Sequence, residues 1–126
     1  MLSPVLDAQK GNYYQALYQW QEGKLVELAG TEVVNKERLV ERIAEFAMPA
    51  LILGECKKLE KVELPANIKL APKTLLMPKA SSIALVAEAE FDPEADKKIF
   101  GLEPYYIRRS EAEELWEQRQ QQLKQQ

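Results

Sequence analysis

Two carboxylates are the side chains of this 126-residue sequence best suited to chemistry. Asp7 lies at the end of a predicted strand, and Glu55 directly follows the apolar stretch 50–54. Carboxylate oxygens at adjacent strand ends can bind Mg²⁺ for phosphoryl transfer. A two-metal site needs further carboxylates at the same point, for which Glu41 and Glu45 are the candidates. In the structural alternative, Asp7 accepts backbone hydrogen bonds from the next turn and Glu55 is solvated.

Several other kinds of chemistry are excluded by residue types that the sequence lacks. It contains no histidine, which excludes Ser-His-Asp and Cys-His sites and histidine-ligated zinc. It contains neither of the glycine-rich phosphate-binding patterns GxxxxGK[ST] and GxGxxG. The single cysteine, Cys56, excludes an internal disulfide framework and favours a reducing, cytoplasmic compartment. We interpret Cys56 as a packing residue.

Composition favours one globular domain over residues 1–126. Hydrophobic residues make up 46% of the chain, which is enough for a core. The net charge of -3 argues against a dedicated nucleic-acid binder, so any contact with RNA is expected to be indirect. The apolar runs are too short to span a bilayer.

The hydrophobic pattern of the first 34 residues predicts an antiparallel meander. A strand over 4–8 is followed by the turn sequence QKGN, in which Gly11 can take a positive φ. Residues 13–20 alternate with a period of two and predict a second strand with aromatic residues on both faces. After a second glycine-containing turn, residues 25–34 predict a third strand or two short ones.

The remainder of the chain predicts helices and one buried strand. Asn35 is a candidate N-cap for a helix that ends at Met48, and the run 50–54 is typical of a strand covered on both faces. A helix over 78–91 is apolar nearly all round, which predicts burial on more than one side. Residues 104–107 predict a further extended segment.

The last predicted element is a helix at the end of the chain. Ser110 and Glu113 form a capping box at its start, and Trp116 lies on its apolar side. The arginines just before it, Arg108 and Arg109, can bind a phosphate or a carboxylate. The whole order predicts an α/β fold of the ribonuclease H-like class, as in one half of an actin-like ATPase. Its sheet is mixed, with a three-strand antiparallel meander, then αβα and a C-terminal helix.

Three segments of the sequence resemble the TsaB (YeaZ) family. SPVLDAQKGNYYQALY is similar to the opening of the second half of that family, and PKASSIALVA to a helix start. EPYYIRRSEAEELW is similar to its terminal signature, and Gly54 matches a glycine turn. Gln9, Lys10, Asn12 and Cys56 depart from the family pattern. The resemblance implies structural or interface roles for Asp7, Gly11, Tyr14, Gly54, Pro78, Ala80, Pro104, Tyr106, Arg108, Ser110 and Glu113.

The resemblance also implies a function. TsaB-like proteins are non-catalytic scaffold subunits of the bacterial complex that makes threonylcarbamoyladenosine at position 37 of tRNA. They pair with a TsaD-like catalytic subunit, and a TsaE-like ATPase joins the assembly. The resemblance therefore implies that this domain holds no cofactor of its own, and that ATP or ADP and metal bind only in the assembled complex. The alternative is a metal-dependent ribonuclease H-like enzyme that uses Asp7 and Glu55.

Family members have two ribonuclease H-like halves, and the sequence resembles the second. We therefore expect an apolar surface that the absent N-terminal half would cover. The candidates for this orphan interface lie on the last two predicted helices: Leu85, Val86, Ala89, Leu115 and Trp116. A homodimer that buries the same surface is a further possibility.

Overall fold

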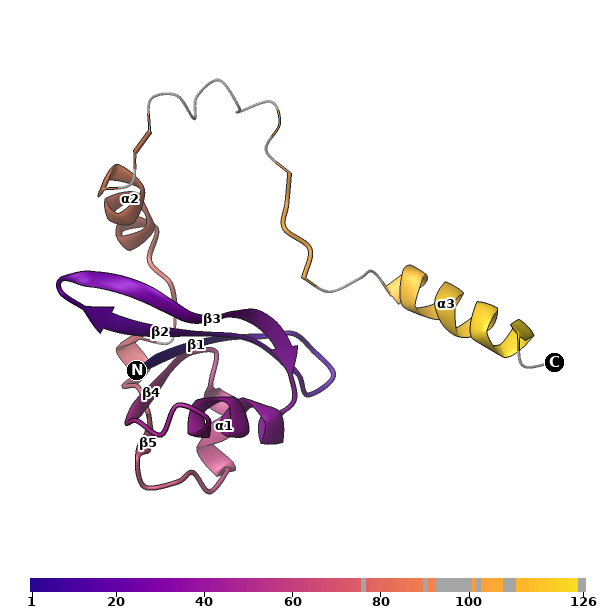
Figure 1. The fold of residues 1–126 in the computed structure, drawn as a ribbon, viewed down its shortest axis with the longest axis horizontal. Coiled ribbons are helices and arrows are strands. Elements are labelled where there is room, and N and C mark those ends of the chain that lie inside the picture. Colours follow the sequence, from indigo (N-terminus) through magenta and orange to yellow (C-terminus); the bar gives the residue numbers. More distant parts are fainter. Residues whose placement is uncertain (76, 90, 93–100, 102, 108–110, 125–126) are drawn as a thin grey trace.

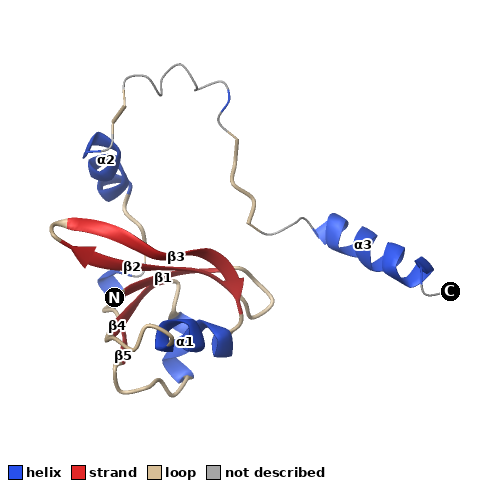
Figure 2. Cartoon of the chain, viewed as in Figure 1, coloured by secondary structure: helices blue, strands red, loops and turns tan. Residues whose placement is uncertain are grey.

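The chain folds around one five-stranded mixed sheet in this computed structural model (Figures 1 and 2). The structure describes residues 1–75, 77–89, 91–92, 101, 103–107 and 111–124. The sheet has the order β3-β2-β1-β4-β5. Its strands are β1 (Leu2–Asp7), β2 (Tyr13–Gln21), β3 (Lys24–Val34), β4 (Ala50–Gly54) and β5 (Ile68–Leu70).

The predicted meander is present, with β1, β2 and β3 paired antiparallel in sequence order. Gly11 and Gly23 have φ of 83° and 80° in the two turns, a conformation that glycine adopts without a steric penalty. A register shift between Leu17 and Tyr18 marks an irregularity in the β2–β3 pairing. Beyond the meander, β4 pairs parallel to β1 and β5 pairs parallel to β4.

Helix α1 (Lys36–Ala44) covers one face of the sheet (Figure 1). As predicted, the Asn35 side chain caps it by accepting a hydrogen bond of 2.8 Å from the backbone N–H of Arg38. The predicted end at Met48 is wrong, because α1 stops at Ala44 and Ala47 has a φ of 50°. That left-handed conformation cannot continue a right-handed helix.

Alternation along the strands decides which side chains enter the core. Val5, Leu17 and Ile52 point toward α1 and pack with Leu39 and Ile43 of that helix. All five are at most 1% exposed.

A polar network lies within this core. The Arg42 guanidinium is 3% exposed and donates to the backbone oxygens of Gln15 and Gly30, at 3.1 and 3.0 Å. The side-chain amide of Gln15 donates to Ser3 Oγ at 3.0 Å and to the backbone oxygen of Leu39 at 3.1 Å. Because these bonds join α1 to β1, β2 and β3, they orient the helix on the sheet.

The charged stretch after β4 contains two short 3₁₀ helices and β5. The first 3₁₀ helix, Lys57–Lys61, places Leu59 in the core, and the second is Lys73–Leu75.

The last two helices, α2 (Ala80–Ala89) and α3 (Glu111–Lys124), stand apart from the main body of the fold (Figure 1). The prediction that the helix at 78–91 is buried on more than one side is wrong here, since every residue of α2 is exposed. An apolar pattern shows that a helix needs a covering surface, but the surface has to be supplied by other residues. Among the described residues, the helices are too short or too polar to cross a membrane.

The predicted extended segment 104–107 is not part of the sheet. The residues of this segment that the structure describes belong to no strand, and Tyr105 and Tyr106 are 84% and 80% exposed. Aromatic residues favour strands when a neighbouring strand offers pairing, and none of the described strands lies beside this segment.

Candidate functional site

Asp7 and Glu55 lie together at the carboxyl ends of β1 and β4, as the topology predicted. The backbone N–H of Asp7 donates to Glu55 Oε2 at 2.7 Å. Gly54 makes this approach possible, because its φ is 95° and a Cβ there would lie 2.3 Å from the backbone oxygen of Val5. The backbone N–H of Glu55 also donates to that oxygen, at 2.9 Å. A side chain on residue 54 would separate the two strands.

The contacts of Asp7 are those of a structural residue. Its Oδ1 accepts a hydrogen bond of 2.8 Å from the backbone N–H of Gln9, which is the turn contact of the structural alternative. Its Oδ2 accepts from the Lys58 ammonium. The Lys58 hydrogen bond and that from Gln9 hold the pKa of Asp7 below its ordinary value. In turn, the Asp7 carboxylate raises the pKa of Lys58.

These contacts can be compared with what a metal site at Asp7 and Glu55 would require. Lys58 supplies the positive charge beside Asp7 that a cation would otherwise supply. Glu55 accepts a backbone hydrogen bond and is therefore not merely solvated. Glu41 and Glu45 point elsewhere and pair with Arg38 on α1, at 3.6 and 2.7 Å. Over the ranges that the structure describes, no three side chains of the ligand-forming types converge on one point.

Lys58 is the contact at this edge that sequence reasoning did not find. It lies 51 residues from Asp7 in the chain, in a charged stretch without hydrophobic periodicity. Only the parallel pairing of β1 with β4, together with the 3₁₀ helix that follows β4, brings it to Asp7.

Two buried groups lie beneath the same edge. Cys56 is 2% exposed, and burial raises the pKa of its thiol, so the reactive thiolate is disfavoured. Tyr13 is 1% exposed, and its hydroxyl has no hydrogen-bond partner among the described residues. Burial is also the main cause that raises the Tyr13 pKa. Burial therefore disfavours both groups as nucleophiles or bases.

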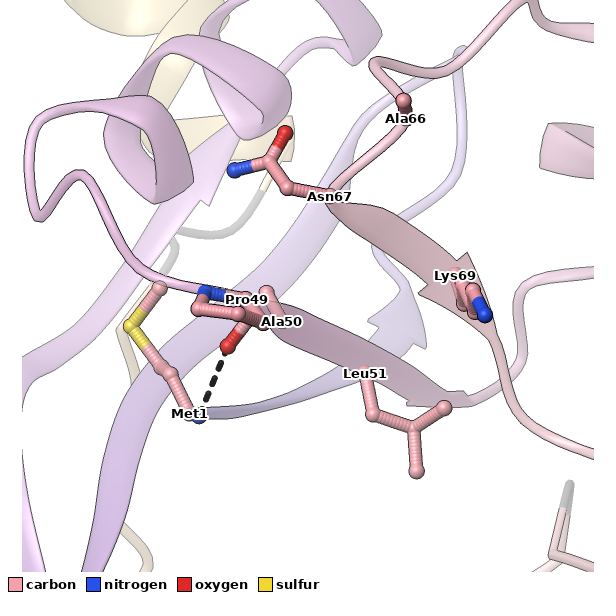
Figure 3. Close-up of a pocket in the computed structure, with 7 residues that line it drawn as sticks. All are labelled: Met1, Pro49, Ala50, Leu51, Ala66, Asn67 and Lys69. Atoms are coloured by element: carbon pink, nitrogen blue, oxygen red, sulfur yellow. Dashed lines mark hydrogen bonds between the residues drawn. The ribbon is translucent and has the colours of Figure 1, made fainter.

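At the opposite, amino-terminal end of β4 lies a hollow of about 510 Å³ (Figure 3). The Met1 amino group donates to the backbone oxygen of Pro49 at 2.9 Å beside it. The walls of this hollow are mostly apolar side chains and backbone, with Asn67 and Lys69 as the polar side chains. None of these residues has a carboxylate, hydroxyl or thiol side chain.

The face of the sheet that points away from α1 is apolar and largely open. Leu6 pairs with Tyr14, and Pro4 pairs with Leu53; Leu6 is 49% exposed and the other three are partly exposed. A groove of about 750 Å³ separates this face from α2. We call it the sheet–α2 groove, and its walls are Pro4, Val5, Leu6, Leu53, Gly54, Thr74, Leu75, Met77, Pro78, Lys79, Ser82, Ile83, Val86 and Ala87.

The predicted orphan-interface residues are exposed, at 67% for Leu85, 58% for Val86, 49% for Leu115 and 62% for Trp116, and Ala89 is exposed as well. Their role in binding stays a prediction.

The family-motif positions are spread over the molecule. Asp7, Gly11 and Gly54 form the turns at the carboxyl edge, and Tyr14 lies on the open face beside Leu6. The remaining described positions are exposed, namely Pro78, Ala80, Pro104, Tyr106 and Glu113. Arg108, Arg109 and Ser110 lie outside the described residues.

Comparison with solved structures defines the class of protein. The chain is similar to the crystal structure of an uncharacterized protein from Pseudomonas aeruginosa described as similar to peptidase YeaZ, with a TM-score of 0.57 and 24% identity. The match covers 85% of this chain and 49% of that one. Together with the mixed five-stranded sheet, it confirms an α/β domain of the actin-like, ribonuclease H-like class.

A curated relative has a related sequence. The chain is 30% identical over 120 residues to the tRNA threonylcarbamoyladenosine biosynthesis protein TsaB of Bacillus subtilis. The match covers 92% of this chain and 51% of the relative, so the chain spans about half the length of the protein it matches. No protein-family model matches the chain. These similarities support the resemblance of the chain to the C-terminal part of the TsaB (YeaZ) family.

Proposed function

We propose that the chain is the C-terminal domain of a non-catalytic scaffold subunit in threonylcarbamoyladenosine biosynthesis on tRNA. The observation that carries this proposal is the 30% identity to TsaB over 92% of the chain. The peptidase named for the Pseudomonas aeruginosa structure carries no activity over to this chain, because a match of 24% identity supports a shared fold only.

The proposed partners are a TsaD-like catalytic subunit, a TsaE-like ATPase and the N-terminal half of the same protein. The domain holds no cofactor, and ATP or ADP and metal bind in the assembled complex. Contact with tRNA is indirect, in keeping with the net charge of -3. The complex works in the cytoplasm.

A scaffold role fits the chemistry at the carboxyl edge. Asp7 is engaged by Lys58 and by the backbone of Gln9, and Glu55 is engaged by the backbone of Asp7. The one thiol, on Cys56, is buried, and the chain has no histidine. These facts favour an edge that stabilises the domain over one that performs a reaction.

The exposed outer side of α2 supports a role in binding. Leu85 and Ala89 are exposed and are not among the residues that line the sheet–α2 groove, so they are open to an incoming surface. Side chains of this type lose little conformational entropy on burial and contribute through the apolar area removed from water. We assign this side of α2 to the contact with the N-terminal half or with the catalytic subunit.

Affinity capture with the TsaD-like protein of the same organism tests the proposal. The full-length parent protein is expected to retain that subunit, and a parent with Leu85→Glu is expected to retain less. A matched Glu60→Gln parent, changed at an exposed position of the first 3₁₀ helix, is expected to bind normally. Failure of the unmodified parent to retain the subunit refutes the proposal.

Titration with Mg²⁺ and Mn²⁺ tests the metal-dependent alternative on the same protein. The scaffold proposal expects no saturable binding at Asp7. Saturable binding that disappears in Asp7→Asn, together with nuclease or phosphatase activity, would establish the enzyme instead.

A further inference from the structure

The sheet–α2 groove is lined mostly by apolar side chains. Leu6 on the sheet side and Ile83 and Val86 on the helix side are 49%, 62% and 58% exposed. Met77, at the edge of the groove, is 68% exposed. A contiguous apolar surface of this kind marks a place where another element packs.

The same chain carries a helix with a matching apolar stripe. Ala112, Leu115, Trp116 and Leu123 fall within one side of α3 at 100° per residue, and all four are exposed. Trp116 is 62% and Leu123 67% exposed. Every other residue of α3 is polar. Of these residues, Arg119 lies within the stripe, and its long side chain can reach water.

Charge also matches between the groove and α3. Four of the first seven residues of α3 are glutamates: Glu111, Glu113, Glu114 and Glu117. Lys79 lines the groove, and Lys73 lies beside the groove residue Thr74. Lys79 of the groove and the glutamates at the start of α3 therefore have opposite charges.

The connection between the two helices is long enough for this contact. Residues 90–110 join α2 to α3, and a chain of this length can reach up to about 70 Å. A tether of that size holds the helix near the groove at an effective concentration of about a millimolar, far above ordinary protein concentrations. Helix α3 of the same chain therefore occupies the groove more readily than a free partner of the same intrinsic affinity.

We propose that α3 docks in the sheet–α2 groove of its own chain, with Trp116 and Leu115 against Leu6 and Val86. The docked helix closes the open face of the sheet, as α1 closes the other face. This leaves Leu85 on the outer side of α2 for a partner. The inference rests on this chain's own surfaces and does not depend on the function proposed above.

Fluorescence of Trp116 in the full chain tests the docking. Trp20→Phe removes the only other tryptophan, at an exposed position near the end of β2. In that background, Trp116 emission is expected to be blue-shifted from that of the unfolded chain, and acrylamide quenching is expected to be reduced several-fold. Val86→Glu, which places a charge in the groove, is expected to abolish both effects.

Leu85→Glu is the matched control, because it makes the same change on α2 outside the groove. It is expected to leave the emission and quenching of Trp116 unchanged. Equal responses to the two changes, or a Trp116 that is solvent-exposed from the start, overturn the proposal. Protection that disappears on hundredfold dilution also overturns it, because the helix would then come from a second copy.

Discussion

Gly54→Ala is the most informative single change at the carboxyl edge. Two costs are expected, one from the backbone and one from the new side chain. A φ of 95° disfavours alanine by about 1–2 kcal/mol. The new Cβ would also lie 2.3 Å from the backbone oxygen of Val5, so β1 and β4 must move apart. The two effects together are expected to lower the free energy of unfolding by at least about 4 kcal/mol.

Gly23→Ala separates the two costs. Gly23 has a φ of 80°, and a Cβ there has no atom within 4 Å, so this variant carries the backbone cost alone. Urea denaturation of both variants, followed by far-UV circular dichroism, measures the difference. We expect Gly54→Ala to be less stable than Gly23→Ala by about 2–3 kcal/mol. Equal losses in the two variants refute the argument that close strand approach requires glycine at residue 54.

Three further predictions concern the polar groups of the fold. Arg42→Met is expected to lower the free energy of unfolding by about 3–5 kcal/mol in urea denaturation, because buried hydrogen-bond acceptors lose their donor. Glu32→Gln is its control and should cost less than about 1 kcal/mol, since the Glu32 side chain is 60% exposed. Tyr13→Phe is expected to be neutral or to raise the thermal midpoint by a few degrees, because the buried hydroxyl lacks a partner among the described residues; a marked loss of stability would reveal a partner. Because the pKa of Asp7 is lowered in the folded protein, its carboxylate adds to the free energy of unfolding at pH values above the ordinary pKa of 3.8. This stabilisation is lost as the pH falls through and below 3.8. Asp7→Asn should therefore flatten the acid side of the stability profile measured by urea denaturation, and an unchanged profile would show that the Lys58 contact is unimportant.

Local sequence patterns determined the elements of the sheet core. The alternation in 13–20 and the two glycine turns predict the meander because each depends only on neighbouring residues. The Asn35 cap was predictable for the same reason. The adjacency of the first strand and the run 50–54 was expected from the ribonuclease H-like order of elements, whereas β5 was not predicted.

The carboxyl edge was only partly predictable. Parallel pairing places Asp7 beside Glu55, and this was expected from the order of the elements. Lys58 was not expected, because a salt bridge across 51 residues has no periodic signal. It changes the chemistry of the edge by engaging the carboxylate that a metal site would need.

The sequence by itself determined the fold class, the turns and the family resemblance, because periodicity, glycine positions and motif order are properties of the linear chain. Tertiary structure alone decided which groups became partners. It gave Arg42 its buried acceptors, left the Tyr13 hydroxyl without a partner among the described residues and opened a groove between α2 and the sheet. The physical reason is that the type of a side chain determines whether it must be buried or paired. The packing of distant segments determines which residues bury it or pair with it.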